Sequence, residues 1–345
     1  MATPSISSLS LLALLTSCAA NGAYRHLGQV ERRASTLDAL VSAGARFEVL
    51  TEGFAWSEGP LWIPADGGYV IFSDIPPNRV MQWREGRGVS VYLDKSGFLG
   101  STPRPNHIAP DEPGSNGLLL DPQGRLVLCQ HGERQVARMT TALNAPSPRY
   151  EAIAREYQGK RFNSPNDAVF HENGDLYFTD PPYGLTRKMQ DESKALPFQG
   201  VYRCSKNGEV TLLTKEMTRP NGIAFSPDYR TLYVANSDPR RAIWMAFPLK
   251  ADGTLGAGDV LFDATPMTRS LKGLPDGLKT DRLGNLFATG PGGVLVLTPG
   301  GEHLGTLLTG QATSNCAFGE DGRSLFVTAD SMLLRVRLKT TGFGF

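Results

Sequence analysis

The chain has 345 residues, of which 40% are hydrophobic and 20% are charged, and its formal net charge is +1. This near-neutral charge, without a basic cluster, excludes the electrostatic footprint of a nucleic-acid-binding protein and favours a monomer or a dimer. The 38 Gly and 24 Pro are spread along the chain, as expected for many short strands joined by turns.

The first predicted element is a short apolar run over residues 9–15, which ends in Leu15-Thr16-Ser17-Cys18. A run of this length that ends in small residues is typical of a secretory signal and is too short to span a bilayer as a helix. We therefore predict a signal peptide over residues 1–18 and export to the periplasm. The ending resembles a bacterial lipoprotein signal, in which a lipidated Cys18 tethers the protein to the envelope. No Lys or Arg precedes the run, and a disordered or loosely helical N-terminal arm is the alternative.

Residues 19–45 are interpreted as a linker or N-terminal arm, either a tether or a short helical preamble, and residues 46–345 as one domain. The cysteines after Cys18 are Cys129, Cys204 and Cys316. Their spacing matches neither a zinc site nor a disulfide framework, so we predict free, buried thiols.

A repeated pattern runs through residues 46–345. A polar residue beside Gly or Pro is followed by a short apolar strand, a turn and a second apolar strand. The six repeats begin at Ser57-Glu58-Gly59-Pro60, Ser115-Asn116-Gly117, Pro165-Asn166-Asp167, Pro220-Asn221-Gly222, Pro275-Asp276-Gly277 and Ser314-Asn315-Cys316. Self-similarity at about 50 residues per unit is typical of propeller blades. The sequence therefore predicts an all-β, six-bladed β-propeller.

The ends of this region predict how the ring closes. A closed ring must join its first and last blades, because otherwise the edge groups remain unpaired. The strand-like segment 47–50 precedes the first repeat, and the segment 333–338 ends the last one. We predict that these two segments pair.

The polar residues that start the repeats predict a metal site. The innermost strand of each blade starts beside the central channel, so residues at this point of each repeat face one axis. The six residues are Glu58, Asn116, Asn166, Asn221, Asp276 and Asn315. Oxygen donors without Cys or His are the ligands of a hard cation, and Ca²⁺ accepts about six to eight of them. A simple turn role is the alternative for Asn116 and Asn221, because Asn beside Gly is a common turn residue.

From about Phe54 to Leu338, these motifs resemble the SMP-30/gluconolactonase family of six-bladed propellers. The motifs that carry the resemblance are Ser57-Glu58-Gly59-Pro60, Asn163-Ser164-Pro165-Asn166-Asp167, Phe178-Thr179-Asp180-Pro181-Pro182-Tyr183-Gly184, Arg219-Pro220-Asn221-Gly222 and Leu274-Pro275-Asp276-Gly277. The resemblance implies a divalent metal, which we expect to be Ca²⁺, with Zn²⁺, Mn²⁺ or Mg²⁺ as alternatives. The implied metal ligands are Glu58, Asn166, Asn221 and Asp276. The segments 198–203 and 290–293 are similar to the bacterial gluconolactonase branch.

The resemblance also implies an activity, the hydrolysis of a small sugar lactone such as glucono-1,5-lactone to the aldonic acid. Asp276 is the candidate general base, because a ligand carboxylate with a free oxygen can accept a proton from water. The candidate substrate contacts are Asn116, Asn315 and His131, with a structural role as the alternative for His131. No Gly-x-Ser-x-Gly elbow favours a covalent route. The alternatives are another lactone or an organophosphate ester as substrate, or a non-catalytic binding propeller with a structural ion.

One segment departs from the family pattern. Residues 96–113 are rich in Pro, Gly and Ser, carry Arg104 and His107, and precede Asn116. This position predicts either a lid over the channel mouth or a surface excursion between two blades.

Overall fold

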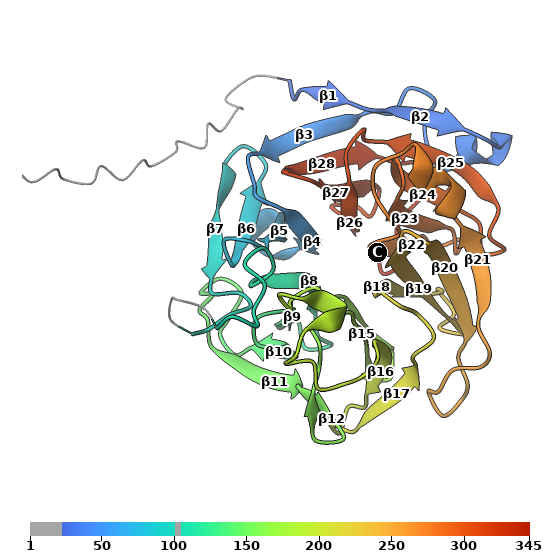
Figure 1. Ribbon diagram of the computed structural model, residues 1–345. Helices are drawn as coiled ribbons and strands as arrows, with labels where there is room; N and C mark the ends of the chain where they lie inside the picture. Colours follow the sequence, from blue (N-terminus) through green and yellow to red (C-terminus); the bar gives the residue numbers. More distant parts are fainter. Residues whose placement is uncertain (1–22, 101–104) are drawn as a thin grey trace, which may run out of the picture.

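The computed structural model describes residues 23–100 and 105–345. These residues form a six-bladed β-propeller, in which six antiparallel sheets surround a central channel (Figure 1). This confirms the all-β propeller predicted from the repeats. The helical elements of the described residues are four short 3₁₀ helices, η1 (Ser35–Ala39), η2 (Ala65–Gly67), η3 (Lys188–Gln190) and η4 (Thr265–Arg269). The predicted signal segment and Cys18 lie outside the described residues.

Each of the first four blades is a meander of four consecutive strands, with the first strand at the channel. Blade 1 contains β4 (Ser57–Ile63), β5 (Tyr69–Asp74), β6 (Arg79–Arg84) and β7 (Gly88–Asp94). Blade 2 contains β8 (Ser115–Leu120), β9 (Leu126–Gln130), β10 (Gln135–Met139) and β11 (Tyr150–Ala154), followed by a two-stranded ribbon of β12 (Glu156–Tyr157) and β13 (Lys160–Arg161). Blade 3 contains β14 (Ala168–Phe170), β15 (Leu176–Asp180), β16 (Gly200–Cys204) and β17 (Val210–Thr214). Blade 4 contains β18 (Pro220–Phe225), β19 (Thr231–Asp238), β20 (Arg241–Pro248) and β21 (Asp259–Asp263).

The last two blades also use strands from the N-terminal part of the chain. Blade 5 contains β22 (Leu278–Thr280), β23 (Leu286–Gly290), β24 (Gly293–Leu297) and β25 (His303–Leu308). Blade 6 contains β26 (Thr313–Gly319), β27 (Ser324–Ala329), β28 (Met332–Arg337) and β3 (Phe47–Glu52). Because β3 pairs antiparallel with β28, the predicted closure of the ring is confirmed.

A buried arginine reinforces this closure. The Arg335 guanidinium on β28 contacts Glu48 of β3 at 2.6 Å, Glu85 of blade 1 at 2.8 Å and Glu320 at 2.9 Å. These charge-assisted contacts join β28 to β3 within the last blade, and join the last blade to the first.

The N-terminal arm differs from the linker expected over residues 19–45. Its described part forms two further strands, β1 (His26–Leu27) beside β3 and β2 (Gln29–Arg32) beside β25. The 3₁₀ helix η1 then buries Leu37 against blades 5 and 6. The arm is ordered in this way because the outer edges of these two blades offer unpaired backbone groups and apolar side chains to cover. Figure 1 shows β1 and β2 running along the outside of the ring.

The apolar core is divided among the interfaces between blades. Six clusters of buried side chains lie between successive blades, including the pair formed by blades 6 and 1. Trp83 of blade 1 and Phe326 of blade 6, for example, pack with ring centroids 6.2 Å apart. Cys129, Cys204 and Cys316 are free, buried members of these clusters, as predicted. Within the described residues, no helix has the length and apolar character needed to cross a membrane.

Breaks in strand register place the repeat-starting residues at the channel. The pairing of the innermost strand with its neighbour shifts between Glu58 and Leu61, between Ser115 and Leu118, and between Pro220 and Ile223. In blades 3 and 5 the innermost strand begins only after the polar residue. A bulge re-aims a side chain that regular pairing would place against a neighbouring blade. The polar residues are therefore free to face the axis.

Candidate metal and substrate site

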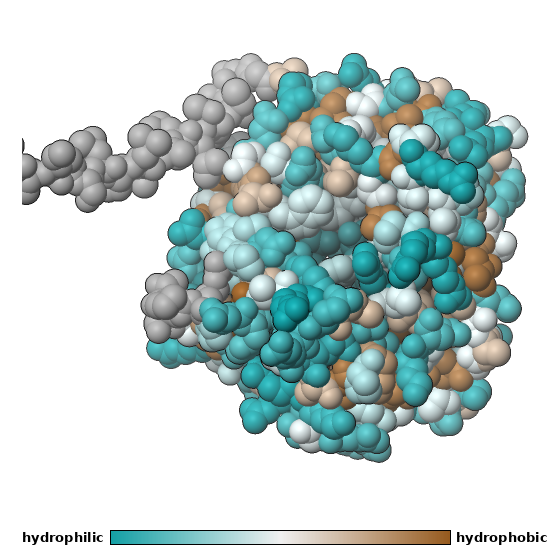
Figure 2. Space-filling view, in the orientation of Figure 1, coloured by the Kyte–Doolittle hydropathy of each residue, from teal (hydrophilic) through white to brown (hydrophobic). Residues whose placement is uncertain are grey.

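A cavity of about 530 Å³ opens at one mouth of the central channel. The space-filling view shows a hollow at the centre of this face, framed mainly by hydrophilic residues (Figure 2). The lining side chains come from all six blades. They are Trp56, Glu58, Glu112, Asn116, Asn166, Tyr183, Asn221, Ser237, Pro239, Thr268, Leu271, Leu274, Asp276, Ala312 and Thr313, with Gly273.

Five of the six residues predicted to face the axis line this cavity, namely Glu58, Asn116, Asn166, Asn221 and Asp276. Four of them carry a buried oxygen, Oδ1 in each case, that accepts no hydrogen bond from the described residues: Asn116, Asn166, Asn221 and Asp276. Leaving a buried acceptor without a partner is costly, so four such atoms around one cavity indicate a ligand that supplies the missing partners. All four are hard oxygen donors, which fit a cation such as Ca²⁺.

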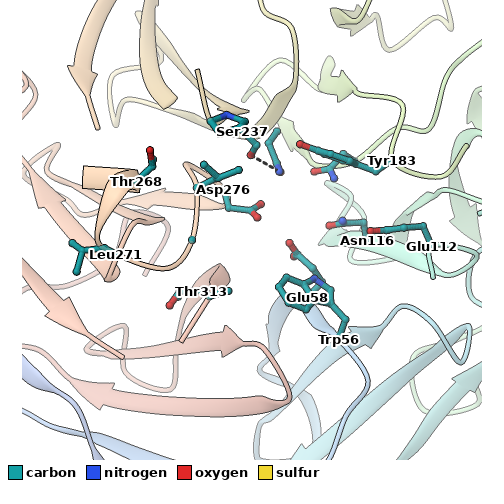
Figure 3. Close-up of a pocket in the computed structure, with 16 residues that line it drawn as sticks. Trp56, Glu58, Glu112, Asn116, Tyr183, Ser237, Thr268, Leu271, Asp276 and Thr313 are labelled. Carbon is teal, nitrogen blue, oxygen red and sulfur yellow. Dashed lines mark hydrogen bonds between the residues drawn. The ribbon is translucent and has the colours of Figure 1, made fainter. Parts of the chain in front are cut away.

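Two carboxylates supply the negative charge of the site. Figure 3 shows the Glu58 and Asp276 carboxylates pointing into the same space. Burial raises the pKa of Glu58 to about 8, although hydrogen bonds from the Gly59 amide and the Asn315 side chain oppose this shift. Burial, followed by repulsion from Glu58, raises the pKa of Asp276 well above its ordinary value. Two mutually repelling carboxylates in a low-dielectric pocket favour a positive charge between them.

The amide of Asn221 is held by β19, the neighbouring strand of its own blade. Its Nδ2 donates to Ser237 Oγ at 2.9 Å, and Ser237 Oγ in turn donates to the Pro275 carbonyl. Because Nδ2 is engaged in this way, Oδ1 is the atom that faces the cavity. The contact to Pro275 also links the Asn221 amide to the backbone next to Asp276.

Hydroxyl groups on the second strands hold the backbone of the site residues. Ser73 on β5 donates to the Asn116 carbonyl at 2.8 Å, and Thr179 on β15 donates to the Asn221 carbonyl at 2.7 Å. Each hydroxyl reaches from one blade to the polar residue of the next. The positions of the site residues are therefore set by contacts around the whole ring, as preorganised sites require.

Asn315 and His131, two of the expected substrate contacts, do not line the cavity. Asn315 is buried, and its Nδ2 donates to Glu58 Oε2 at 3.2 Å while its Oδ1 accepts from the Cys316 amide at 2.9 Å. Thr313 faces the cavity in its place, because the register of β26 shifts between Thr313 and Asn315. His131 is fully buried, and its Nδ1 lies 2.9 Å from Glu112 Oε2. Both residues thus contact a carboxylate that lines the cavity.

The lining residues that were not singled out from the sequence include Trp56, Glu112 and Tyr183. Trp56 directly precedes the motif that begins at Ser57, and Tyr183 lies inside the motif of residues 178–184, so nearness to these motifs is the sequence signal for both residues. Burial raises the pKa of Tyr183 above its ordinary value, so its phenol stays protonated and can donate a hydrogen bond. No local pattern marks Glu112.

The segment predicted as a lid or a surface excursion carries Glu112 to the channel. Its described parts are residues 96–100 and 105–113, and residues 105–113 lie against the segment between β15 and β16. The Ala109 amide donates to the Gly184 carbonyl at 2.9 Å, and the Thr186 amide donates to the His107 carbonyl at 3.2 Å. These contacts with blade 3 hold Glu112 beside the channel mouth. Arg104 lies outside the described residues.

Because the candidate metal ligands include uncharged amides, a cluster of charged side chains does not mark the site. Across residues 23–100 and 105–345, no three or more His, Cys, Asp or Glu side chains form a cluster that could hold a metal ion. The candidate ligands here comprise two carboxylates, Glu58 and Asp276, and two amides, Asn166 and Asn221. Such a set fits a hard cation that accepts neutral amide oxygens, and it does not fit a metal that requires thiolate or imidazole.

Comparison with known proteins places this architecture in a family. The chain matches the SMP-30/Gluconolactonase/LRE-like region over residues 56–331. It is 38% identical over 320 residues to a gluconolactonase of Zymomonas mobilis, a match that covers 92% of this chain and 88% of that relative. The solved structure of a gluconolactonase from Xanthomonas campestris is 31% identical, with a TM-score of 0.75, and the match covers 93% of this chain and 100% of that one.

A more distant structure shares the fold. The calcium-binding protein regucalcin of Agrobacterium tumefaciens is 21% identical, with a TM-score of 0.63, over 86% of this chain and 94% of that one. The family match begins at Trp56, two residues before Glu58, and ends at Ser331, in the turn between β27 and β28 of blade 6. Because the match spans all six blades and the cavity at their centre, this chain belongs to the SMP-30/gluconolactonase/LRE-like family.

Proposed function

We propose that this protein is a metal-dependent lactonase that hydrolyses a sugar lactone, such as glucono-1,5-lactone, to the aldonic acid, with Ca²⁺ as the metal. The coarser assignment, a hydrolase of lactone esters, follows from family membership and from a gluconolactonase relative that aligns along most of the chain. The single observation that carries the metal is the convergence of four partnerless buried oxygens on one cavity.

The candidate ligands of the cation are Glu58, Asn166, Asn221 and Asp276. The two carboxylates supply two negative charges, which balance the charge of a divalent cation. The two amides supply neutral oxygen ligands. Ca²⁺ tolerates irregular arrangements of oxygen donors, whereas Mg²⁺ demands near-ideal octahedral geometry. The remaining partnerless oxygen, Asn116 Oδ1, lies on the wall of the same cavity and is the candidate contact for substrate or for a metal-bound water.

The cation, when bound, supplies Lewis acidity that polarises the lactone carbonyl and stabilises negative charge on its oxygen. The protein orients the reacting groups. Asp276 lines the cavity, and the carboxylate oxygen that does not bind the cation can accept a proton from the attacking water. The water oxygen bonds to the carbonyl carbon, the ring C–O bond breaks, and the ring oxygen leaves as a hydroxyl that takes up one proton. Ser237 keeps Asn221 in one orientation throughout.

The test is the hydrolysis of glucono-1,5-lactone by the purified protein, with the spontaneous rate subtracted. We expect activity that is lost with a chelator, restored by Ca²⁺, and reduced by at least about 100-fold in Glu58→Gln, which keeps the side-chain shape but removes a charged ligand. Asp276→Asn with metal still bound should lower kcat, and an unchanged kcat would remove Asp276 as the base. A folded, metal-loaded protein without activity would redirect the assignment to another ester or to a binding propeller.

A further inference from the structure

Glu112 is a third carboxylate on the cavity wall, outside the candidate ligand set. It lies in the segment that precedes β8, and its side chain is 20% exposed. Figure 3 shows it on the same side of the cavity as Asn116 and Tyr183, with Asp276 across the open space. The proposed metal ligands already supply two charges, so the cation does not account for this carboxylate.

His131 holds Glu112 in place. The imidazole is fully buried at the end of β9, and its Nδ1 lies 2.9 Å from Glu112 Oε2. Its Nε2 is buried without a partner among the described residues. A carboxylate oxygen is an acceptor, so Nδ1 carries the hydrogen of this contact and donates it to Oε2.

The backbone fixes the same contact. The His131 amide donates to the Gly114 carbonyl at 3.1 Å, two residues after Glu112. A side chain at Gly184 would lie 2.8 Å from the His131 Cβ, so the segment after β15 packs directly on this residue. His131 therefore has little freedom to move, and the carboxylate that it holds is oriented before any substrate arrives.

The rest of the wall indicates what Glu112 contacts. No Lys or Arg is among the described residues that line the cavity, so no cation of the protein neutralises Glu112 there. A carboxylate is only an acceptor, and its remaining lone pairs must be met by donors from the ligand or from water. Hydroxyl groups are such donors, whereas a further anion would be repelled by three carboxylates.

We infer that Glu112 is a specificity-determining residue that accepts a hydrogen bond from a ring hydroxyl of the substrate, and that His131 is its positioning residue. This inference rests on the proposed lactonase function and assigns recognition of the substrate hydroxyls to a residue outside the candidate metal ligands. A site built to bind a hydroxyl discriminates against the analogue that lacks it, because the buried acceptor then remains unpaired.

The experiment compares two six-membered lactones that share the reacting ester. Glucono-1,5-lactone carries ring hydroxyls, and δ-valerolactone carries none. The quantities measured are kcat and KM for both lactones with Ca²⁺ present, after subtraction of spontaneous hydrolysis. In Glu112→Gln we expect kcat/KM for gluconolactone to fall by about 10- to 100-fold, the range of one charge-assisted hydrogen bond, mainly through KM. For δ-valerolactone the change should stay within about 3-fold, because no contact is lost.

Two variants of His131 test the positioning role. His131→Asn keeps an N–H donor near the place of Nδ1, and it should retain most of the preference for gluconolactone. His131→Leu removes the donor and should lose that preference as Glu112→Gln does. The control is Glu151→Gln, which makes the same charge change on β11 of the same blade, on a side chain that is 64% exposed. It should behave as wild type on both lactones.

Each outcome separates this inference from the proposed function. An equal loss on both lactones in Glu112→Gln would assign this carboxylate to catalysis or metal affinity and would overturn the specificity role. Unchanged kinetics on gluconolactone would overturn the contact itself. If the wild-type protein hydrolyses neither lactone, the proposed function fails and the inference fails with it. If the wild type hydrolyses both at equal kcat/KM, the lactonase stands and hydroxyl recognition fails.

Discussion

At four of the six channel positions, the polar residue is followed by a glycine, and contacts between blades explain this pairing. A side chain at Gly59 would lie 2.2 Å from the Asn116 carbonyl oxygen, and one at Gly222 would lie 2.2 Å from the Asp276 carbonyl oxygen. Each glycine therefore allows the innermost strand of the next blade to approach. The polar residue and its glycine together set how tightly the ring closes around the cavity.

We predict that Gly222→Ala lowers stability by about 1 to 3 kcal/mol, because the added methyl forces the backbone at Asp276 to move. The same movement should weaken Ca²⁺ binding, since Asn221 and Asp276 are candidate ligands. Urea unfolding and a calorimetric titration measure the two effects. The control is Gly44→Ala, where an added methyl meets nothing within 4 Å. Equal stability of the two variants would contradict the steric account.

Ser237 offers a test of how the Asn221 amide is oriented. Ser237→Ala removes the oxygen that accepts from Asn221 Nδ2, so the amide can rotate. We expect Ca²⁺ affinity to fall by about 10-fold or more while the protein stays folded, the usual effect of losing a residue that orients a ligand. Ser90→Ala on β7, at an exposed position, is the matched control. Unchanged affinity in Ser237→Ala would show that the ring holds Asn221 without this contact.

We predict that the buried carboxyl group of Asp180 makes the stability of the folded protein depend on pH. Its carboxylate accepts from the Asn163 and Ser164 amides at 2.8 Å, and burial raises its pKa to about 7. The unfolded-state pKa is about 3.9, so the folded protein binds this proton more tightly than the unfolded chain. The stabilising contribution of the protonated group is full below about pH 4 and is lost as the pH rises through about 7.

Asp180→Asn cannot titrate and isolates this effect. We expect the stability of Asp180→Asn relative to wild type to rise between about pH 4 and pH 7, by at most about 1.4 kcal/mol per pH unit. Urea unfolding of both proteins across this range, with chelator present so that metal binding does not contribute, measures the difference. A difference that does not vary with pH would contradict the shifted pKa.

Closure of the propeller ring depends on β3, whereas β1 and β2 only cover the outer edges of blades 6 and 5. A protein that begins at Arg46 loses β1, β2 and η1 but keeps β3. We expect it to fold with a lower Tm, because residues such as Leu304 and Leu307 lose their cover. Each such uncovered side chain costs about 1.5 to 3 kcal/mol when fully exposed.

A protein that begins at Gly53 also loses β3 and serves as the comparison. The edge of β28 is then unpaired and the buried side chain of Phe47 is missing, so we expect aggregation. Gel filtration and thermal unfolding of the two truncated proteins distinguish these outcomes. If the shorter protein folds as a monomer with the stability of the longer one, closure by β3 is not required.

For the whole molecule, the central channel has two unlike mouths. The polar cavity lies at one mouth, and a separate cavity of about 360 Å³, which the C-terminal residues help to line, is surrounded mainly by apolar side chains of the innermost strands. Leu61, Leu119, Phe225 and Phe318 belong to this second lining. Asp167 and Lys279 also line this second cavity, but Glu58 and Asp276 meet at the other mouth, where a bound cation would contact several blades at once.

We therefore predict that Ca²⁺ stabilises the whole fold. At about 100 times its Kd, a ligand that binds only the folded state adds about 2.7 kcal/mol, which raises the Tm on the order of 5 °C for a domain of this size. Thermal unfolding with chelator and then with Ca²⁺, Mg²⁺, Mn²⁺ or Zn²⁺ measures the shift, and Glu58→Gln should abolish it. A Tm that no divalent cation changes would contradict the metal site independently of any enzyme assay.

Much of this architecture was accessible from local sequence. The six repeats, their channel-facing starts and the pairing of 47–50 with the last blade all follow from patterns of a few residues that recur. The strands β1 and β2 were not accessible in this way. They have two and four residues and carry no periodic signal of their own, since they form only where blades 5 and 6 present open edges.

The amino-acid sequence by itself determined the blade count, the closure and the oxygen-rich set of channel residues, because alternating apolar strands and turn residues act over short distances. Only the tertiary structure decided which side chains reach the cavity. It placed Asn315 beneath Glu58, buried His131 behind Glu112, and brought Glu112 and Tyr183 together from separate segments. These placements depend on contacts between blades, such as that of Ala109 with Gly184, which join residues far apart in the chain and leave no local pattern.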